Sequence, residues 1–309
     1  MTRPDVLVIG EVLVELSSTD PLRDGIPLTL GFSGDALNSA AAAAAAGAHT
    51  ALVARVPTDE LGDELVARVA ALGVDTGYLR RVAGQHGLYF QHADPDGARG
   101  YVYVRRGSAG SGLTPADLPA DVLPGAVVLA SGIACAISDT AYATVQAAAH
   151  AGGRFVYDPN WRPRLVDAAI AAWHLRRLAP LATVVTPAWP GEVTALCGPV
   201  PDETAACAAV LALGAAAVAL TRGPAGVLLA DGVTSHELPA VPPESVVDQT
   251  GAGDVLAGTA AARLALGDPL LAAVRAGVAA ASLSLRGIGG TGYLPNWAET
   301  MRALPGPAR

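Results

Sequence analysis

Short apolar runs alternate with helix-like segments along most of the chain. The runs are rich in Val, Leu, Ile and Ala, and their composition predicts buried strands at residues 5–10, 51–56, 126–132, 154–160, 183–187 and 215–223. The clearest intervening helix covers residues 58–73, where Thr58 can cap the first turn and Gly73 can end the last. Its apolar positions share one face: Leu61, Leu65, Val69 and Leu72. This alternation predicts an α/β fold with a mostly parallel sheet.

Two regions break this rhythm, residues 12–33 and 86–108. The second alternates apolar and polar residues around an Asp-Pro-Asp-Gly turn, as a β-hairpin with one wet face does. The two regions are therefore predicted to form a small β-sheet lid. A further hairpin at residues 226–238 turns at Asp231-Gly232 and is expected at the edge of the core sheet.

The composition favours one folded domain. Of the 309 residues, 51% are hydrophobic and 16% are charged, which excludes a disordered chain. Length alone does not divide an α/β protein of this size, so residues 1–309 are expected to form a single domain with the two lid segments. The longest apolar stretches, such as Ala40 to Ala46, are too short to span a membrane. The N-terminal residues lack the pattern of a secretion signal, and a cytoplasmic location is expected.

The charge of the chain indicates a small-molecule partner. The net charge is -8 and the arginines are scattered, which argues against a nucleic-acid surface. Three cysteines without CxxC spacing suggest neither a disulfide framework nor a zinc site, and the histidines are dispersed. Because the sequence contains no lysine, any phosphate must be bound by arginine, backbone N–H groups or a metal ion.

The segment with the clearest chemistry is residues 246–267, VVDQTGAGDVLAGTAAARLALG. Its glycine turn opens an alanine-rich helix, and unpaired N–H groups of Gly251, Ala252 and Gly253 at a helix start would point at a phosphate. Asp254, in the first helical turn, could accept the proton of an attacking hydroxyl. The alternative is an ordinary glycine turn in which Asp254 is a helix-start acid.

The D-x-x-G-A-G-D pattern followed by a small-residue helix resembles the C-terminal signature of the ribokinase/PfkB family of carbohydrate kinases. The resemblance spans nearly the whole chain, because residues 10–16 resemble the first strand of the family and residues 31–76 its N-terminal signature. It implies a ribokinase-like three-layer α/β core with a β-sheet lid, and MgATP as the phosphoryl donor. Within the family, residues 87–90, 101–118, 131–138 and 158–165 are most similar to 2-keto-3-deoxygluconate kinases.

The resemblance also implies roles for individual residues. The residues that match sugar-acid ligands are Gly34, Asn38, Tyr89, Tyr103, Arg105 and Arg162. Arginine suits a carboxylate because its guanidinium makes paired charge-assisted hydrogen bonds. Those that match the nucleotide loop are Thr221, Gly223 and Gly226. Glu192 aligns with a glutamate that acts on magnesium through water, and Asp248 with an aspartate whose neighbourhood often binds a monovalent cation.

Each of these assignments has a plainer alternative. Tyr89, Tyr103 and Arg105 could lie on the solvated face of a hairpin, and Arg162 could be a surface-loop arginine. The TRGPAG loop could be a strand-to-turn junction, and Glu192 a helix-start acid. The chain also departs from the family at Trp189, where the N-x-x-E motif has asparagine, and at Ser33, where a glycine is usual.

The leading hypothesis is a kinase for 2-keto-3-deoxygluconate. A fructokinase or a ribosyl-nucleoside kinase is an alternative of the same class, and a non-catalytic sugar or nucleotide sensor is an alternative of another class. The lid could cap its own site or pair with a second subunit, which would give a homodimer through edge strands.

Overall fold

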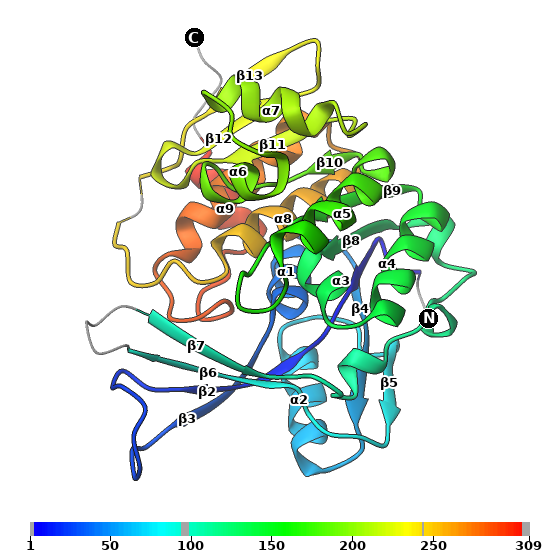
Figure 1. The fold of residues 1–309 in the computed structure, drawn as a ribbon, viewed down its shortest axis with the longest axis vertical. Coiled ribbons are helices and arrows are strands. Elements are labelled where there is room, and N and C mark those ends of the chain that lie inside the picture. The colour runs from blue at the N-terminus through cyan, green and yellow to red at the C-terminus, as the bar shows by residue number, and fades with distance from the viewer. Residues whose placement is uncertain (1–2, 94–98, 243, 305–309) are drawn as a thin grey trace.

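A nine-stranded sheet runs through the computed structural model, which describes residues 3–93, 99–242 and 244–304 (Figure 1). The strand order is β13-β12-β11-β10-β9-β8-β1-β4-β5. The parallel strands are β1 (Val6–Ile9), β4 (Thr50–Pro57), β5 (Leu79–Val82), β8 (Val127–Ser131), β9 (Arg154–Asp158), β10 (Val184–Val185) and β11 (Val218–Thr221). The antiparallel hairpin of β12 (Val227–Ala230) and β13 (Ser235–Leu238) forms one edge. The six predicted core strands and the edge hairpin are confirmed, whereas β5 was not predicted.

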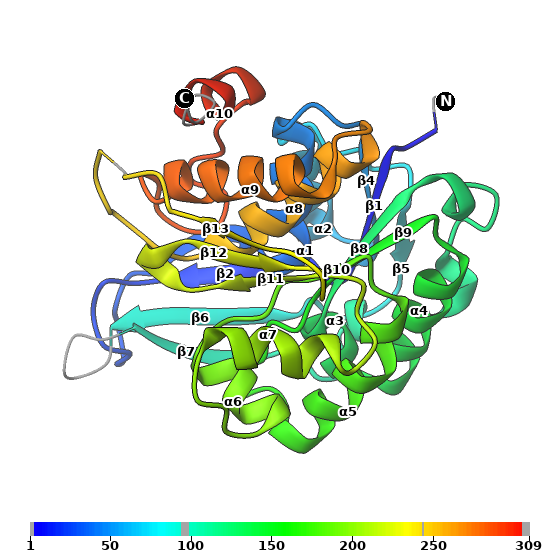
Figure 2. The same cartoon turned by 90° about the horizontal axis from the view of Figure 1, so that it is seen from above.

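Helices cover both faces of this sheet (Figure 2). One face packs against α1 (Asp35–Ala45), α2 (Glu60–Ala71), α8 (Ala252–Ala265) and α9 (Leu270–Ser284). The other packs against α3 (Gly132–Ala136), α4 (Asp139–Ala151), α5 (Ala168–Leu178), α6 (Gly191–Cys197) and α7 (Glu203–Leu211). In β1, Val6 and Val8 face the first layer and Leu7 and Ile9 the second, which is why the strand is apolar at every position. The last helix, α10 (Trp297–Ala303), packs against α9.

The start of helix α2 differs from the prediction by one residue, whereas its end agrees. Asp59, not Thr58, is its N-cap, because the Asp59 carboxylate accepts a hydrogen bond from Gly62 N at 2.8 Å. The Thr58 hydroxyl instead donates to the Val82 carbonyl at 3.1 Å, and it thereby links to the unpredicted strand β5. The helix ends as predicted, with Gly73 at a φ of +78°.

A second, four-stranded sheet lies beside the large one, in the order β3-β2-β6-β7. It consists of β2 (Leu13–Ser17), β3 (Thr29–Ser33), β6 (Leu88–Ala93) and β7 (Arg99–Val104). It extends away from the helical layers at one end of the molecule (Figure 1). The two regions predicted to form a separate sheet therefore do so. The predicted Asp-Pro-Asp-Gly turn falls on residues 94–97, outside the described residues.

Helices α1 and α8 approach each other closely because their facing residues are small. A Cβ atom added to Gly258 would lie 2.1 Å from the Ser39 carbonyl oxygen, so only glycine fits there. The alanine run of α1 is buried against α8 and the sheet, from Ala40 to Ala43. Within the described residues, none of the helices is long and apolar enough to cross a membrane.

The substitution Gly258→Ala tests this contact. Alanine in the middle of a helix normally stabilises it by about 1 kcal/mol relative to glycine. Here the overlap with Ser39 should reverse the sign and destabilise the protein by roughly 1–3 kcal/mol. Chemical denaturation monitored by circular dichroism would measure the change. Gly191→Ala is the matched control, since a Cβ there meets nothing within 4 Å; an equal effect of both substitutions would contradict the argument.

Candidate active site

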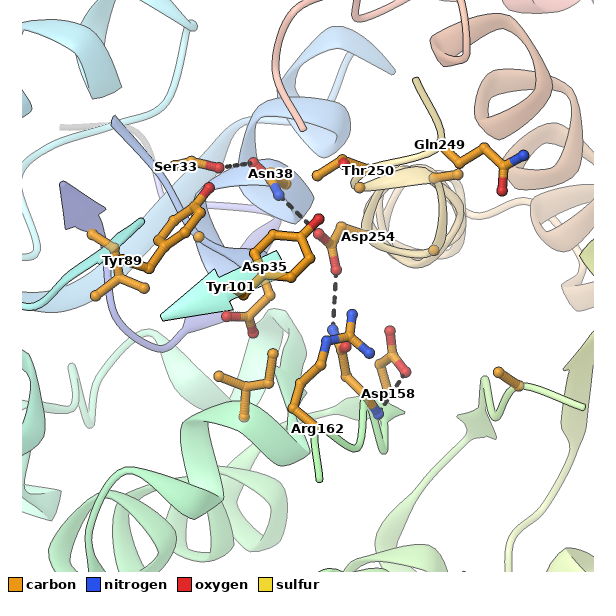
Figure 3. A pocket seen from close by; sticks show the side chains of 18 of the residues that line it. Ser33, Asp35, Asn38, Tyr89, Tyr101, Asp158, Arg162, Gln249, Thr250 and Asp254 are labelled. Carbon is orange, nitrogen blue, oxygen red and sulfur yellow. Dashed lines mark hydrogen bonds between the residues drawn. The ribbon is translucent and has the colours of Figure 1, made fainter. Parts of the chain in front are cut away.

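A cavity of about 480 Å³ opens where the carboxyl ends of the parallel strands face the small sheet (Figure 3). Asp158 lies at the end of β9 and Thr221 at the end of β11, and both line the cavity. The start of α8 forms another wall, and the small sheet contributes Tyr89, Tyr101 and Tyr103. Ligands of open parallel sheets bind at this edge, because loops and helix N-termini converge there.

The glycine turn places Asp254 on the wall of this cavity. Gly251 is the N-cap of α8 and has a φ of +80°, a conformation that favours glycine. A Cβ at Gly251 would lie 2.6 Å from the Gly290 Cα atom. The N–H group of Ala252 donates to the Gln249 carbonyl at 3.3 Å, so the prediction that all three turn N–H groups are unpaired is wrong for Ala252. The helix start still faces the cavity with Gly251, Ala252 and Gly253.

Two asparagines hold the Asp254 carboxylate. Asn38 Nδ2 donates to Oδ2 at 2.8 Å, and Asn160 Nδ2 donates to Oδ1 at 3.2 Å. Asp254 is 8% exposed. Burial and the negative charge of Asp35 raise the pKa of Asp254 to about 7, against the opposing effects of Asn38, Arg162 and Asn160. A carboxylate with this pKa can accept a proton near neutral pH.

Two further buried carboxylates, Asp158 and Glu192, line the cavity. Burial, followed by the charges of Glu192 and Asp254, raises the pKa of Asp158 well above its usual value. Burial also raises the pKa of Glu192, although this carboxylate accepts hydrogen bonds from Trp161 N at 2.5 Å and Ala188 N at 2.7 Å. Among the described residues, no group of three or more His, Cys, Asp or Glu side chains could hold a metal ion by itself. The positive charge of Arg162 lowers the pKa values of Asp158 and Glu192, but it does not offset the effect of burial.

The small sheet contributes aromatic side chains to the cavity, and two arginines lie beside them, one directly after β7 and one in the loop after β9. Tyr101 and Tyr103 are stacked, with ring centroids 6.4 Å apart, and the Tyr89 hydroxyl donates to Glu15. Arg105 is buried and forms an ion pair with Glu11, at 2.8 Å between Nη2 and Oε2. The guanidinium of Arg162 points into the cavity near Asp254, although the residue is exposed (Figure 3).

The comparison with known proteins fits this arrangement. Residues 3–297 match the model of the pfkB family of carbohydrate kinases. The chain belongs to this family. It is 30% identical over 306 residues to a 2-dehydro-3-deoxygluconokinase of Thermoproteus tenax, covering 97% of this chain and 94% of the relative.

Two solved structures show the same fold. A PfkB protein from Polaromonas sp. JS666 has a TM-score of 0.83 and 26% identity, with 96% of this chain and 98% of the other covered. A putative ribokinase II from E. coli, solved in complex with ATP and Mg²⁺, has a TM-score of 0.85 and 23% identity, with 97% and 98% covered. The predicted ribokinase-like fold, with a large mostly parallel sheet and a small separate sheet, is confirmed.

Most of the predicted site residues of this carbohydrate kinase meet in the one cavity. Those that line it are Gly34, Asn38, Tyr89, Tyr103, Arg105, Arg162, Glu192, Thr221, Gly251, Ala252, Gly253 and Asp254. Tyr89 is 7% exposed and Arg105 is 6% exposed, so a solvated hairpin face does not describe them. Their binding roles remain predictions.

Three predicted residues of the kinase lie outside the cavity lining. Gly226 has a φ of +85°, and a Cβ there would lie 2.1 Å from the Leu238 carbonyl oxygen, so the hairpin alone requires glycine. Gly223 belongs to the same turn. Asp248 is buried and accepts hydrogen bonds from Thr250 N at 2.7 Å and Gly289 N at 2.8 Å, which ties the glycine turn to the loop after α9.

Sequence reasoning missed several cavity residues of the kinase. Asp35 follows Gly34 at the start of α1, Asp158 is the last residue of β9, and Asn160 lies two residues beyond it. Polar residues immediately after a buried parallel strand were the available signal, since such positions lie at the ligand edge of the sheet. Tyr101 could have been found from its alternation with Tyr103 along β7.

Gly290 is expected to position the kinase's Asp254 through Asn38. A Cβ at Gly290 would lie 2.2 Å from Asn38 Nδ2, and Gly290 does not adopt a positive φ, so alanine can take its backbone conformation. Gly290→Ala should therefore displace Asn38 and lower kcat for sugar-dependent ADP release roughly tenfold to a hundredfold.

A double-mutant cycle isolates this route. Adding Gly290→Ala to Asn38→Ala should cost nothing further, because the displaced group is already absent. Gly125→Ala serves as the control, since a Cβ there lies at an ordinary 3.6 Å from Arg3. Additive losses in the double variant would show that Gly290 acts by another route.

Proposed function

We propose that this protein transfers the γ-phosphoryl group of ATP to a hydroxyl of a small sugar acid, with 2-keto-3-deoxygluconate as the substrate and Asp254 as the base. The observation that carries the proposal is the Asp254 carboxylate, which is buried at the start of α8, held by Asn38 and Asn160, and open to the cavity. The name of the Thermoproteus tenax relative supports the choice of sugar acid.

In the proposed reaction, the Asp254 carboxylate accepts the proton of the substrate hydroxyl as its oxygen attacks the γ-phosphorus. The bond between the γ-phosphorus and the β,γ-bridging oxygen breaks, and ADP leaves. The N–H groups of Gly251 and Gly253 at the start of α8 and the helix dipole stabilise the charge that develops on the transferred group, whereas the N–H of Ala252 is bonded to Gln249. Phosphoryl transfer needs positioning and electrostatic stabilisation more than covalent chemistry, which suits a site built from a helix start and a carboxylate.

The sugar acid would lie between the α1 start and the small sheet. Gly34, with a φ of +130°, is the N-cap of α1 and lines the cavity, and a Cβ there would lie 3.0 Å from the Glu11 carbonyl oxygen. Arg162 would supply the charge for the substrate carboxylate, and Arg105 and the stacked tyrosines would contact the sugar body. The small sheet would act as a lid over a single kinase domain, since closing it would exclude water as a competing acceptor.

Magnesium fits the cavity as part of the bound nucleotide. Asp158 and Glu192 are buried carboxylates whose pKa values are raised mainly by burial, and a cation near them would offset that unfavourable environment. Mg²⁺ usually keeps several water ligands and binds through one or two carboxylates together with substrate phosphates, so no cage of protein ligands is needed. When bound, it would neutralise charge on the phosphates. Thr221, with Gly223 and Gly226 in the following turn, would contact the nucleotide.

A monovalent cation beside Asp248 is not needed to explain this residue. The carboxylate accepts two backbone hydrogen bonds, which account for its burial. The family resemblance is the basis for an ion there, and it stays a prediction.

The substrate and the base can be tested together. Purified protein with MgATP should release ADP with 2-keto-3-deoxygluconate in preference to fructose or a ribonucleoside, and Asp254→Asn should lower the rate by about 10²- to 10⁴-fold. The base acts when deprotonated, so kcat/KM should rise with pH through about 7 and fall below it. Turnover of neutral sugars alone would contradict the sugar-acid proposal. Thermal shifts with both ligands but no turnover would favour a sensor.

We also propose that two copies associate through the outer face of the small sheet. Strand register places eight apolar side chains on that face, but Val14 is only 2% exposed and Phe32 packs against the buried core. The other six are Leu16, Leu30, Leu88, Phe90, Val102 and Val104. Leu30 is 54% exposed and Val104 is 52% exposed. An apolar face of this kind is unusual on an isolated subunit, and a second copy would offer a matching one.

Leu30→Asp combined with Val102→Asp should abolish this association, because charge would be introduced into the apolar face on both of its outer strands, β3 and β7. Size-exclusion chromatography with light scattering would measure the mass. Val233→Asp is the control, since Val233 is 92% exposed in the turn between β12 and β13. A monomeric wild-type protein would contradict the proposal.

A further inference from the structure

Glu11 is a buried carboxylate two residues after the end of β1. It is 2% exposed and contacts residues that lie more than ninety positions later in the chain. Arg105 Nε donates to Glu11 Oε2 at 2.9 Å, and Arg105 Nη2 lies 2.8 Å from the same oxygen. Ser108 Oγ donates to Oε1 at 2.5 Å. Both carboxylate oxygens are therefore bound, and Glu11 joins the core sheet to the segment that follows β7.

Two glycines make room for this carboxylate. A Cβ at Gly87 would lie 2.3 Å from Glu11 Oε1, and a Cβ at Gly110 would lie 2.4 Å from Glu11 Cγ. Neither glycine has a positive φ, so their backbone conformations do not require glycine. The space they leave is the space that the Glu11 side chain occupies.

The ion pair changes the charge of the cavity. Arg105 and Arg162 are the arginines among the described residues that line it, and they face the carboxylates of Asp35, Asp158, Glu192 and Asp254. Because Glu11 lies against Arg105, the pair has no net charge. In the part of the chain that the structure describes, Arg162 donates a hydrogen bond to the Trp161 carbonyl and is not paired with a carboxylate. Its positive charge opposes the rise in the pKa values of Asp158 and Asp254, so it acts within the cavity.

We propose that Glu11 sets the charge selectivity of this cavity: it makes Arg105 part of a neutral hydrogen-bonding pair and leaves Arg162 to supply the net positive charge for the substrate carboxylate. This rests on the proposed sugar-acid kinase function. Arg105 then orients the sugar without distinguishing strongly between acids and neutral analogues. Burial raises the pKa of Glu11, and Arg105 and Ser108 oppose that effect. The contacts of both oxygens are those of an ionised carboxylate.

A charge cycle tests the proposal at pH 8. The proteins are the wild type, Glu11→Gln, Arg105→Gln and the double variant, and each is assayed with 2-keto-3-deoxygluconate and with its primary amide. The quantity compared is the ratio of kcat/KM for the acid to kcat/KM for the amide. Glu11→Gln should raise this ratio about tenfold, because Arg105 becomes an uncompensated cation in a poorly solvated site. Arg105→Gln should lower the ratio by about the same factor, since the negative charge of Glu11 then has no positive charge beside it.

The double variant separates charge from structure. It restores neutrality, so its ratio should return to within about threefold of the wild-type value even if both rates are lower. A purely structural role would lower both rates without moving the ratio, and that result would overturn the inference. If thermal melting shows that Glu11→Gln does not fold, the ratio of Arg105→Gln is compared with that of the double variant. The inference then requires the ratio to rise from the first to the second, and equal ratios would overturn it. Wild-type protein that is inactive on the acid would refute the proposed substrate and with it this inference.

Discussion

The close packing of α1 on α8 is the contact on which the rest of the site depends. Gly258 allows the two helices to approach until a side chain would meet the Ser39 carbonyl, and the alanines of α1 fill the interface without pushing the helices apart. Both helices begin at the same edge of the sheet. Asn38 in the first turn of one therefore reaches Asp254 in the first turn of the other. A larger residue at position 258 would overlap the Ser39 backbone and push the two helices apart.

The burial of charged side chains is the second constraint, and the protein meets it differently at Asp254 and at Arg105. Around Asp254, desolvation and Asp35 disfavour the ionised form, so the carboxylate titrates near neutrality instead of remaining a permanent anion. At Arg105, a buried cation is offset directly by Glu11. A buried charge without a partner is costly, so the protein either moves the pKa of the group or supplies a counter-charge. The pKa of Asp254 is an example of the first solution, and the ion pair of Arg105 with Glu11 is an example of the second.

The small sheet has two unlike faces because side chains alternate along its strands. Tyr89 and Tyr103 face the cavity, whereas Phe90 and Val102 face away from it. One set of strands thereby provides polar aromatic groups for a ligand and an apolar surface on the opposite side.

Local patterns along the chain were enough to predict most of the strands, whereas the packing of the folded chain brings distant residues of these elements together. Apolar runs predicted the core strands, turn residues predicted the edge hairpin, and alternation predicted the small sheet, because these signals lie among neighbouring residues. The family signature indicated Asp254 and most of the cavity lining. Local sequence did not reveal that Thr58 bonds to β5 instead of capping α2, or that Arg105 pairs with Glu11. The contact of Gly290 with Asn38 was equally hidden. Each of these depends on residues far apart in the chain, and their approach is set by the packing of whole helices and sheets.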